Sequence, residues 1–238
     1  VQAGGENLLR NGDFASYSTN NSIGWDNSLN GTYAISHWGS GYNGGVGSPT
    51  IGYHAHLNTS KFGWPVLEFI NKNSIYNLSH RWMGISSTVY KKEKLLPGQQ
   101  YTFSADVMID TAGMYIHGGL YSARIGSSLA FNSGQFTLAP ASINTWQRVS
   151  YTFTLDANID LSQGVSFIIY GYSGAEGIAW VKNVSLQLGN KGSYVRCDAD
   201  VDVDAQAKAD AAKSAAISTA SSDATTKANT AESNAKTY

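Results

Sequence analysis

Cysteine is nearly absent from this sequence. The 238 residues include a single cysteine, Cys197, so no disulfide can form within the chain. The compartment in which the protein works stays open, and its stability must come from a hydrophobic core. Hydrophobic residues make up 42% of the chain, which is ample for such a core.

Charged residues are also few. They amount to 14% of the chain and leave a formal net charge of -1. Proteins that bind nucleic acid or an anionic membrane carry a basic patch. We therefore expect neither nucleic acid nor a membrane as a partner.

Long apolar runs are missing as well. No uninterrupted apolar stretch of about 18 residues occurs, so no membrane-spanning helix is expected. Residues 1–5 lack the basic start and apolar core of a signal peptide. We expect the chain to be an excised part of a longer one.

Aromatic residues, by contrast, make up 12% of the chain, which also contains 25 glycines and many Asn, Ser and Thr residues. Aromatic rings can stack on the apolar faces of sugar rings, whereas amides and hydroxyls can pair with sugar hydroxyls. This composition is typical of sugar-binding and extracellular β-sandwich proteins.

The clearest periodic pattern lies at residues 95–109. A Pro-Gly turn at 97–98 is followed by strict alternation of apolar and polar residues. The apolar face comprises Tyr101, Phe103, Ala105, Val107 and Ile109. The pattern predicts a central strand with one face on the core and a second, weakly charged face suited to a neutral polar ligand.

Similar short strands are predicted along the rest of the first 190 residues. They lie at 32–35, 52–57, 66–71, 82–90, 114–121, 146–155, 165–172 and 178–188. Gly118 and Gly119 predict a β-bulge. The absence of helical periodicity favours an all-β fold, an antiparallel β-sandwich of the jelly-roll type. Residues 26–65 are less regular, and form either binding loops or loops pinned by their own aromatic residues.

The composition changes completely near residue 204. Gly, Pro and Trp disappear, and Ile217, Ala224, Ala231 and Tyr238 recur every seventh residue. We predict a domain at 1–190, a linker at 191–203 and an Ala-rich α-helix at 204–238 that begins a coiled-coil stalk. The helix would associate with copies of itself, pack on the domain or fray, and the alternative is a disordered linker.

Four motifs, in order, carry a resemblance to a known family. They are the opening residues 6–14, Pro-Gly-Gln-Gln-Tyr-Thr-Phe-Ser at 97–104, and the segments beginning at Trp146 and Trp180. The chain from about 6 to 190 resembles family 4 and family 9 carbohydrate-binding modules. It is most similar to those on tail and baseplate adhesion proteins of phages that infect Gram-positive bacteria.

This resemblance implies a non-catalytic, lectin-like module of a phage tail receptor-binding protein. Its partner would be a cell-surface polysaccharide of a Gram-positive host, and its location the extracellular virion tail. Phage fibres are commonly trimeric, so a homotrimer formed through the C-terminal helix is expected. The alternatives are a substrate-targeting module of a secreted glycoside hydrolase or bacterial surface protein, and a structural spacer in a fibre.

No cofactor is expected. Members of the resembled family often bind a structural calcium ion beside an acidic residue of the closing motif. This chain has Lys182 at that position, which argues against calcium. Glu6 and Asp13 could still supply oxygen ligands. His54 and His56 have a spacing that can hold a metal, but no third ligand is evident, so a structural pair is favoured.

The sequence also argues against catalysis. A retaining glycosidase needs two carboxylates about 5 Å apart, and the nearest acidic pair, Asp106 and Asp110, is divided between a strand and the turn after it. No Gly-x-Ser-x-Gly motif occurs. We therefore predict that the chain is not an enzyme.

The candidate ligand-binding residues follow from strand parity, because they lie opposite the predicted core faces. They are Trp82, Asp106, Tyr115, His117, Tyr170 and Tyr172, with Trp38 and Trp64 added from the irregular segment. We expect the first six to share one outer face. In the alternative, residues 26–65 cover this face and bury its rings. Trp25, Trp146 and Trp180 are assigned to the core or its edges.

Overall fold

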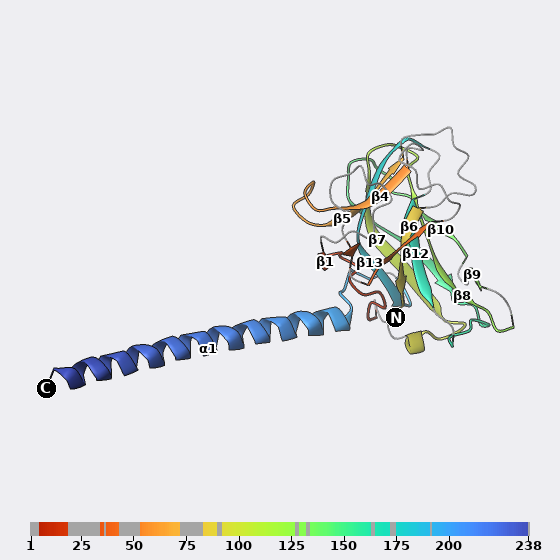
Figure 1. Cartoon of the computed structure of the whole chain (residues 1–238). Helices are drawn as coiled ribbons and strands as arrows, with labels where there is room; N and C mark the ends of the chain where they lie inside the picture. The colour runs from red at the N-terminus through yellow and green to blue at the C-terminus, as the bar shows by residue number, and fades with distance from the viewer. Residues whose placement is uncertain are drawn as a thin grey trace. The chain divides into compact units, whose positions relative to one another are not determined.

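A computed structural model describes most of the chain. The described residues are 5–18, 34–35, 37–42, 53–71, 83–89, 92–126, 129–131, 134–162, 165–171, 175–190 and 192–237. The chain divides into two compact units, residues 1–197 and 198–238. The first unit consists of β-strands and the second of one α-helix (Figure 1).

Five antiparallel strands form the sheet that we call the β7 sheet, in the order β11-β7-β13-β5-β4. Its strands are β4 (Tyr53–Asn58), β5 (Val66–Asn71), β7 (Gln100–Ile109), β11 (Gln147–Thr154) and β13 (Gly177–Leu188). The strand predicted from the alternation at 95–109 is thus confirmed as β7, although it lies second from the edge rather than at the middle.

The opposing sheet, which we call the β8 sheet, has the order β10-β8-β12-β6-β3, with β9 also paired to β8. Its strands are β3 (Gly39–Tyr42), β6 (Met83–Thr88), β8 (Ile116–Ala123), β9 (Leu129–Phe131), β10 (Phe136–Leu138) and β12 (Ser166–Gly171). Two short strands, β1 (Tyr17–Ser18) and β2 (Ala34–Ile35), form a separate pair, and a 3-10 helix, η2, spans Lys92–Lys94. The prediction of an antiparallel β-sandwich is confirmed.

The core lies between the two sheets and is held by aromatic contacts. The ring of Phe103 on β7 stacks on that of Phe167 on β12, with centroids 4.3 Å apart, and lies 5.2 Å from Phe136 on β10. Gly118 on β8 makes room for these rings, because a Cβ atom there would lie 2.7 Å from Phe136. All five apolar residues of the predicted β7 face belong to this core.

Strand β8 has no β-bulge at its two central glycines. The pairing with β12 runs without interruption from Tyr121 opposite Ser166 to Ile116 opposite Gly171. The predicted bulge is therefore wrong. Gly118 allows the rings of Phe136 and Phe167 to pack closely against the strand, and no extra residue is inserted. As a consequence, Tyr121 stays in phase with His117.

The bulge occurs instead in β13, which sequence analysis did not predict. Its register with β7 shifts between Lys182 and Ser185, and Asn183 has a positive φ of 53°. The extra residue reverses which positions face the core. Trp180, which we had assigned to the core or its edges, therefore lies on the outer side of the β7 sheet in a small separate cluster. Leu188, at the end of the predicted inward face, is 42% exposed.

The α-helix, α1, spans Asp198–Lys236 and so begins before the predicted residue 204. Ion pairs one turn apart join Lys227 to Asp223 (2.7 Å) and Lys236 to Glu232 (2.5 Å). Nearly all of its side chains are exposed. No helix in the described part of the chain is sufficiently long and apolar to span a membrane.

The residues just before α1 belong to the β unit rather than to a linker. Cys197 is completely buried, and Arg196 forms an ion pair with Asp13 at 3.1 Å. The predicted linker at 191–203 is therefore divided between the two units at residue 197. The Arg196 contact joins this segment to the opening turn of the chain.

We predict that truncation after Cys197 leaves the thermal unfolding transition of the β unit unchanged. Truncation after Asn190 removes the buried thiol and the Arg196 ion pair, and should lower the melting temperature by about 5 °C. Circular dichroism melts of the two truncated proteins test this. Equal melting temperatures would show that residues 192–197 contribute nothing to the fold.

Candidate functional site

The two sheets present chemically different outer faces. Strand parity predicted which residues point away from the core but not on which sheet they lie. Asp106 lies on β7, whereas His117 and Tyr170 lie on β8 and β12 of the opposite sheet. The prediction that these residues share one face is therefore wrong.

Two predicted ligand-binding residues meet on the outer side of the β8 sheet. Tyr115 precedes β8, and its ring contacts the ring of His117 edge-on, with centroids 5.1 Å apart. Both side chains are half-buried. Thr137, on the unpredicted strand β10, lies with Oγ1 3.4 Å from Nδ1 of His117. These three residues form the centre of the candidate site.

Sheet register extends this site across three more strands. His117 is paired with Tyr170, Tyr170 with Gly84, and Gly84 with Gly41. Directly paired residues lie on the same side of a sheet, so one row runs from β10 to β3. Tyr170 is thus a register neighbour of His117, as the prediction requires.

The next row on this face is also rich in small residues. Gly119 is paired with Ile168, Ile168 with Ser86, and Ser86 with Gly39. Ile168 is only 7% exposed although it lies outside the main core cluster. Glycines recur in both rows and add no side chain above the backbone, although Gly119 is itself buried.

The imidazole of His117 is partly removed from water. Burial lowers the pKa of His117 below its usual value of about 6.5, and a hydrogen bond with the backbone of Phe136 opposes part of this effect. The ring is therefore neutral at pH 7.5. A neutral imidazole has one donor and one acceptor nitrogen. Nε2 of His117 is buried and Nδ1 faces Thr137, so the exposed polar group at this point is the Thr137 hydroxyl.

The outer face of β7 is occupied by its own hydrogen bonds. Arg148 on β11 donates to Asp106 Oδ1 (3.1 Å) and to the hydroxyls of Ser104 (2.8 Å) and Ser185 (2.7 Å). Asn183 donates to the second Asp106 oxygen at 2.6 Å. Asp106 therefore holds β7, β11 and β13 together, and the predicted open polar face for a neutral ligand does not exist there.

The two tryptophans added from the irregular segment have different positions. Trp38 is 4% exposed, and its indole nitrogen donates to the carbonyl oxygens of Arg10 (3.0 Å) and Asn11 (3.2 Å). Its predicted place at a binding surface is wrong, because the ring belongs to the core. Trp64, in contrast, is 46% exposed between β4 and β5.

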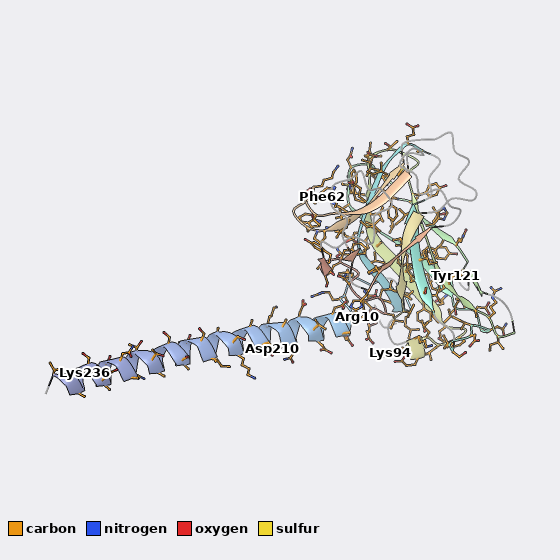
Figure 2. All side chains as sticks on the ribbon, in the orientation of Figure 1. Arg10, Phe62, Lys94, Tyr121, Asp210 and Lys236 are labelled. Atoms are coloured by element: carbon orange, nitrogen blue, oxygen red, sulfur yellow. The ribbon has the colours of Figure 1, made fainter. Side chains whose placement is uncertain are left out.

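Trp64 belongs to an aromatic group on the outer side of the β7 sheet. The ring of Phe62 stacks on Trp64 at 6.2 Å and meets Trp146 and Trp180 edge-on at 5.4 and 5.7 Å. Figure 2 shows Phe62 and Tyr121 on opposite sides of the sandwich. Sequence analysis missed this group because it placed Trp146 and Trp180 in the core or at its edges.

Some predicted site residues lie beyond this description. Trp82 and Tyr172 fall outside the described residues, as does Trp25, and the side chain of Tyr170 is not described. The same holds for the side chains of His54 and His56. Their predicted roles stay predictions.

Several described acidic residues of the β unit take part in structural contacts. Asp110 accepts hydrogen bonds from the backbone of Ile178 (2.7 Å) and from Thr111 (3.0 Å). Glu6 pairs with Lys94, and Asp13 pairs with Arg196. Within the described residues, no group of three or more His, Cys, Asp or Glu side chains is placed to hold a metal.

Comparison with known proteins bears on the fold. No family model matches this chain, and no curated protein matches it. A proposed sugar-binding protein from Bacteroides thetaiotaomicron aligns with a TM-score of 0.51 at 13% identity, over 77% of this chain and 100% of that protein. The two proteins therefore share the β-sandwich fold.

Two further solved structures align less well. A family 4 carbohydrate-binding module gives a TM-score of 0.45 at 15% identity, covering 76% of this chain and 99% of that module. The enzymatically active domain of tailspike protein 4 from bacteriophage CBA120 gives 0.46 at 11% identity. That match covers 77% of this chain and 21% of the tailspike domain, so this chain corresponds to about a fifth of its length.

The lowered pKa of His117 predicts a pH dependence of stability. The unfolded chain takes up a proton near pH 6.5, whereas the folded protein does so at lower pH, so the free energy of unfolding should fall as pH drops below 6.5. In His117→Gln this contribution is absent. We expect the melting temperature of the variant to fall less than that of the parent between pH 7.5 and pH 5.

Thermal melts of both proteins at the two pH values measure this difference. The same comparison with Tyr17→Ala, which changes a 39% exposed tyrosine, provides the control. Equal losses of melting temperature in His117→Gln and the parent would contradict the assigned burial effect.

Proposed function

We propose that the β unit is a non-catalytic carbohydrate-binding module and that the outer face of the β8 sheet binds the sugar. The observation that carries this proposal is the contact of Tyr115 with His117 in a row continued by Tyr170 and two glycines. Aromatic rings bind the apolar face of a sugar, and the exposed hydroxyl of Thr137, beside the neutral imidazole, binds a sugar hydroxyl.

The fold and the charge pattern support this ligand class. The register neighbours of His117 on this face are uncharged, so a neutral saccharide meets no unpaired charge in these rows. Binding modules of the β-sandwich class occur among the structures similar in fold, and the Bacteroides protein is described as sugar-binding. The engagement of Asp106 and Asp110 in structural contacts favours binding over catalysis.

We further propose that this module is a jelly-roll domain of a phage tail adhesion protein that recognises the surface polysaccharide of a Gram-positive bacterium. This finer assignment is supported by the order of the four sequence motifs described above. The alternative is a module that targets a secreted glycoside hydrolase or a bacterial surface protein to its polysaccharide. Binding of the 1–197 fragment to whole Gram-positive cells, compared with cells stripped of wall polysaccharide, distinguishes them.

We predict that Tyr115→Ala and His117→Ala each weaken saccharide or cell binding several-fold. Loss of one stacked aromatic residue removes on the order of 1 kcal/mol of binding free energy, which is about a fivefold change in Kd. The melting temperature should stay nearly constant, because both side chains are half-buried at the outer face. Cell-binding assays and thermal melts are run on the same samples.

Tyr17→Ala serves as the matched control for these variants, since it removes an exposed tyrosine from β1. It should leave binding unchanged. If Tyr115→Ala and His117→Ala lower the melting temperature strongly and lose binding only in proportion to unfolding, the rings are structural and the proposed site is wrong.

We also predict that α1 mediates self-association, as a trimer in the longer protein. Residues 217, 224 and 231 recur at heptad spacing within a helix whose side chains are nearly all exposed. Shared attachment would raise weak single-site affinity through effective concentration. Analytical ultracentrifugation of a chain extended beyond residue 238 should give a trimer, and the 1–197 fragment a monomer. A monomeric extended chain at high concentration contradicts the stalk.

A further inference from the structure

A second site is indicated on the opposite side of the sandwich, above the β7 sheet. The segment between β4 and β5 places Phe62 and Trp64 beside Trp146 and Trp180. The four rings form what we call the tryptophan platform. Trp180 is nearly fully buried at its base, whereas Trp64 is 46% exposed at its rim. A large aromatic ring is thus presented to solvent by a packed support.

Two lysines place their ammonium groups on this platform. Lys182 Nζ lies 4.4 Å from the ring centroid of Trp64 and 4.6 Å from that of Trp146. Lys61 Nζ lies 4.0 Å from the ring centroid of Trp180. Cation–π contacts of this kind hold the two charges close to the rings.

The nearby carboxylates are engaged elsewhere. Asp106 is the register neighbour of Lys182, but its oxygens accept hydrogen bonds from Arg148 and Asn183. Glu68 is 5% exposed and accepts hydrogen bonds from Trp180 and, at 3.2 Å, from Asn58. The contacts that the structure gives for the ammonium groups of Lys182 and Lys61 are with aromatic rings.

Among the described residues of this face, the charges therefore do not cancel. Arg148 balances Asp106, and Glu68 is buried beneath the platform. Lys182 and Lys61 then leave a positive charge at the solvent side of the rings. An exposed ring beside ammonium groups is complementary to a ligand that has a flat apolar face and an anionic substituent.

We propose that the tryptophan platform binds acidic saccharides, with a uronic acid residue as the recognised unit. The sugar ring stacks on Trp64, and its carboxylate accepts hydrogen bonds from the ammonium groups of Lys182 and Lys61. This site is separate from the neutral site around His117, because the two lie on the outer faces of opposite sheets. It shares with the proposed function only the ligand class, carbohydrate.

The lysine at 182 is the main specificity determinant. It is the position at which the closing motif departs from the acidic residue expected from the family resemblance. The bulge that follows it places Asn183 against Asp106, which frees Lys182 to contact the rings. Loss of its charge should therefore remove the preference for acidic over neutral polymers.

Affinity electrophoresis and calorimetry with polygalacturonate, alginate and hyaluronate test the proposal. The carboxyl-reduced form of each polymer is the neutral counterpart. We expect the 1–197 fragment to bind at least one of the three uronate polymers and to bind its reduced form about tenfold more weakly. Raising the salt concentration from about 0.05 M to 0.5 M should weaken uronate binding, because screening shortens the reach of the lysine charges.

Four variants of the full chain separate the contributions. Lys182→Gln should weaken uronate binding about fivefold, and Trp64→Ala about tenfold. Lys213→Gln, on the exposed surface of α1, changes the net charge equally and should have no effect. Lys182→Arg keeps the positive charge and should retain most of the binding. This variant therefore distinguishes an electrostatic role of the side chain from a structural one.

Absence of binding to all three uronate polymers would overturn the proposal, as would equal binding of the reduced polymers. Retention of uronate binding in Trp64→Ala, or equal losses in Lys182→Gln and Lys213→Gln, would also contradict it. The outcome is independent of the β8 sheet, since Tyr115→Ala should leave uronate binding intact. Loss of uronate binding in Tyr115→Ala would show that the acidic ligand binds at the β8 sheet and not at the tryptophan platform.

Discussion

The stacking of Phe103 on Phe167, with ring centroids 4.3 Å apart, is the contact on which the arrangement of the sandwich depends. It joins β7 to β12 and fixes one face of each sheet as the inside. Because side chains alternate along a strand, every other residue of both strands is then directed outward. The two outer faces follow from this contact, and so does the separation of the candidate sites.

The alternation of apolar residues predicted the β7 face correctly, and the 66–71 strand matches β5. It could not predict which sheet each strand joins, because pairing depends on contacts far apart in sequence. Asp106 and His117 have the same outward parity but lie on different sheets. The contact of Tyr115 with His117 agrees with their shared parity, because the two residues are only two positions apart in sequence.

The bulge at Asn183 is the second limit of the sequence pattern. A positive φ at an asparagine leaves no glycine signal, and the reversal of parity moved Trp180 from the predicted core to the outer cluster. The grouping of the four rings of the tryptophan platform could therefore not be predicted from the sequence. The signal that could have indicated it was Lys182, a cationic residue two positions after Trp180 on the same strand.

The two outer faces achieve different chemistry with the same fold. On the β8 sheet, glycine positions and the Thr137 hydroxyl beside a neutral imidazole form an uncharged surface. On the β7 sheet, Asp106 and Arg148 hydrogen-bond to each other, and the ammonium groups of lysines that contact the aromatic rings place positive charge near the exposed Trp64. The two proposed sites therefore differ in the charge of the sugar that each is suited to bind.

NMR titration of the isotope-labelled 1–197 fragment with neutral oligosaccharides released from Gram-positive cell walls can locate the sugar site on one sheet or the other. We expect amide shift changes concentrated in β8, β10 and β12, around Tyr115, His117 and Tyr170. The strands of the β7 sheet should show little change. Shift changes confined to the β7 sheet, or none with any neutral oligosaccharide, would contradict the assignment of the sugar site to the β8 sheet.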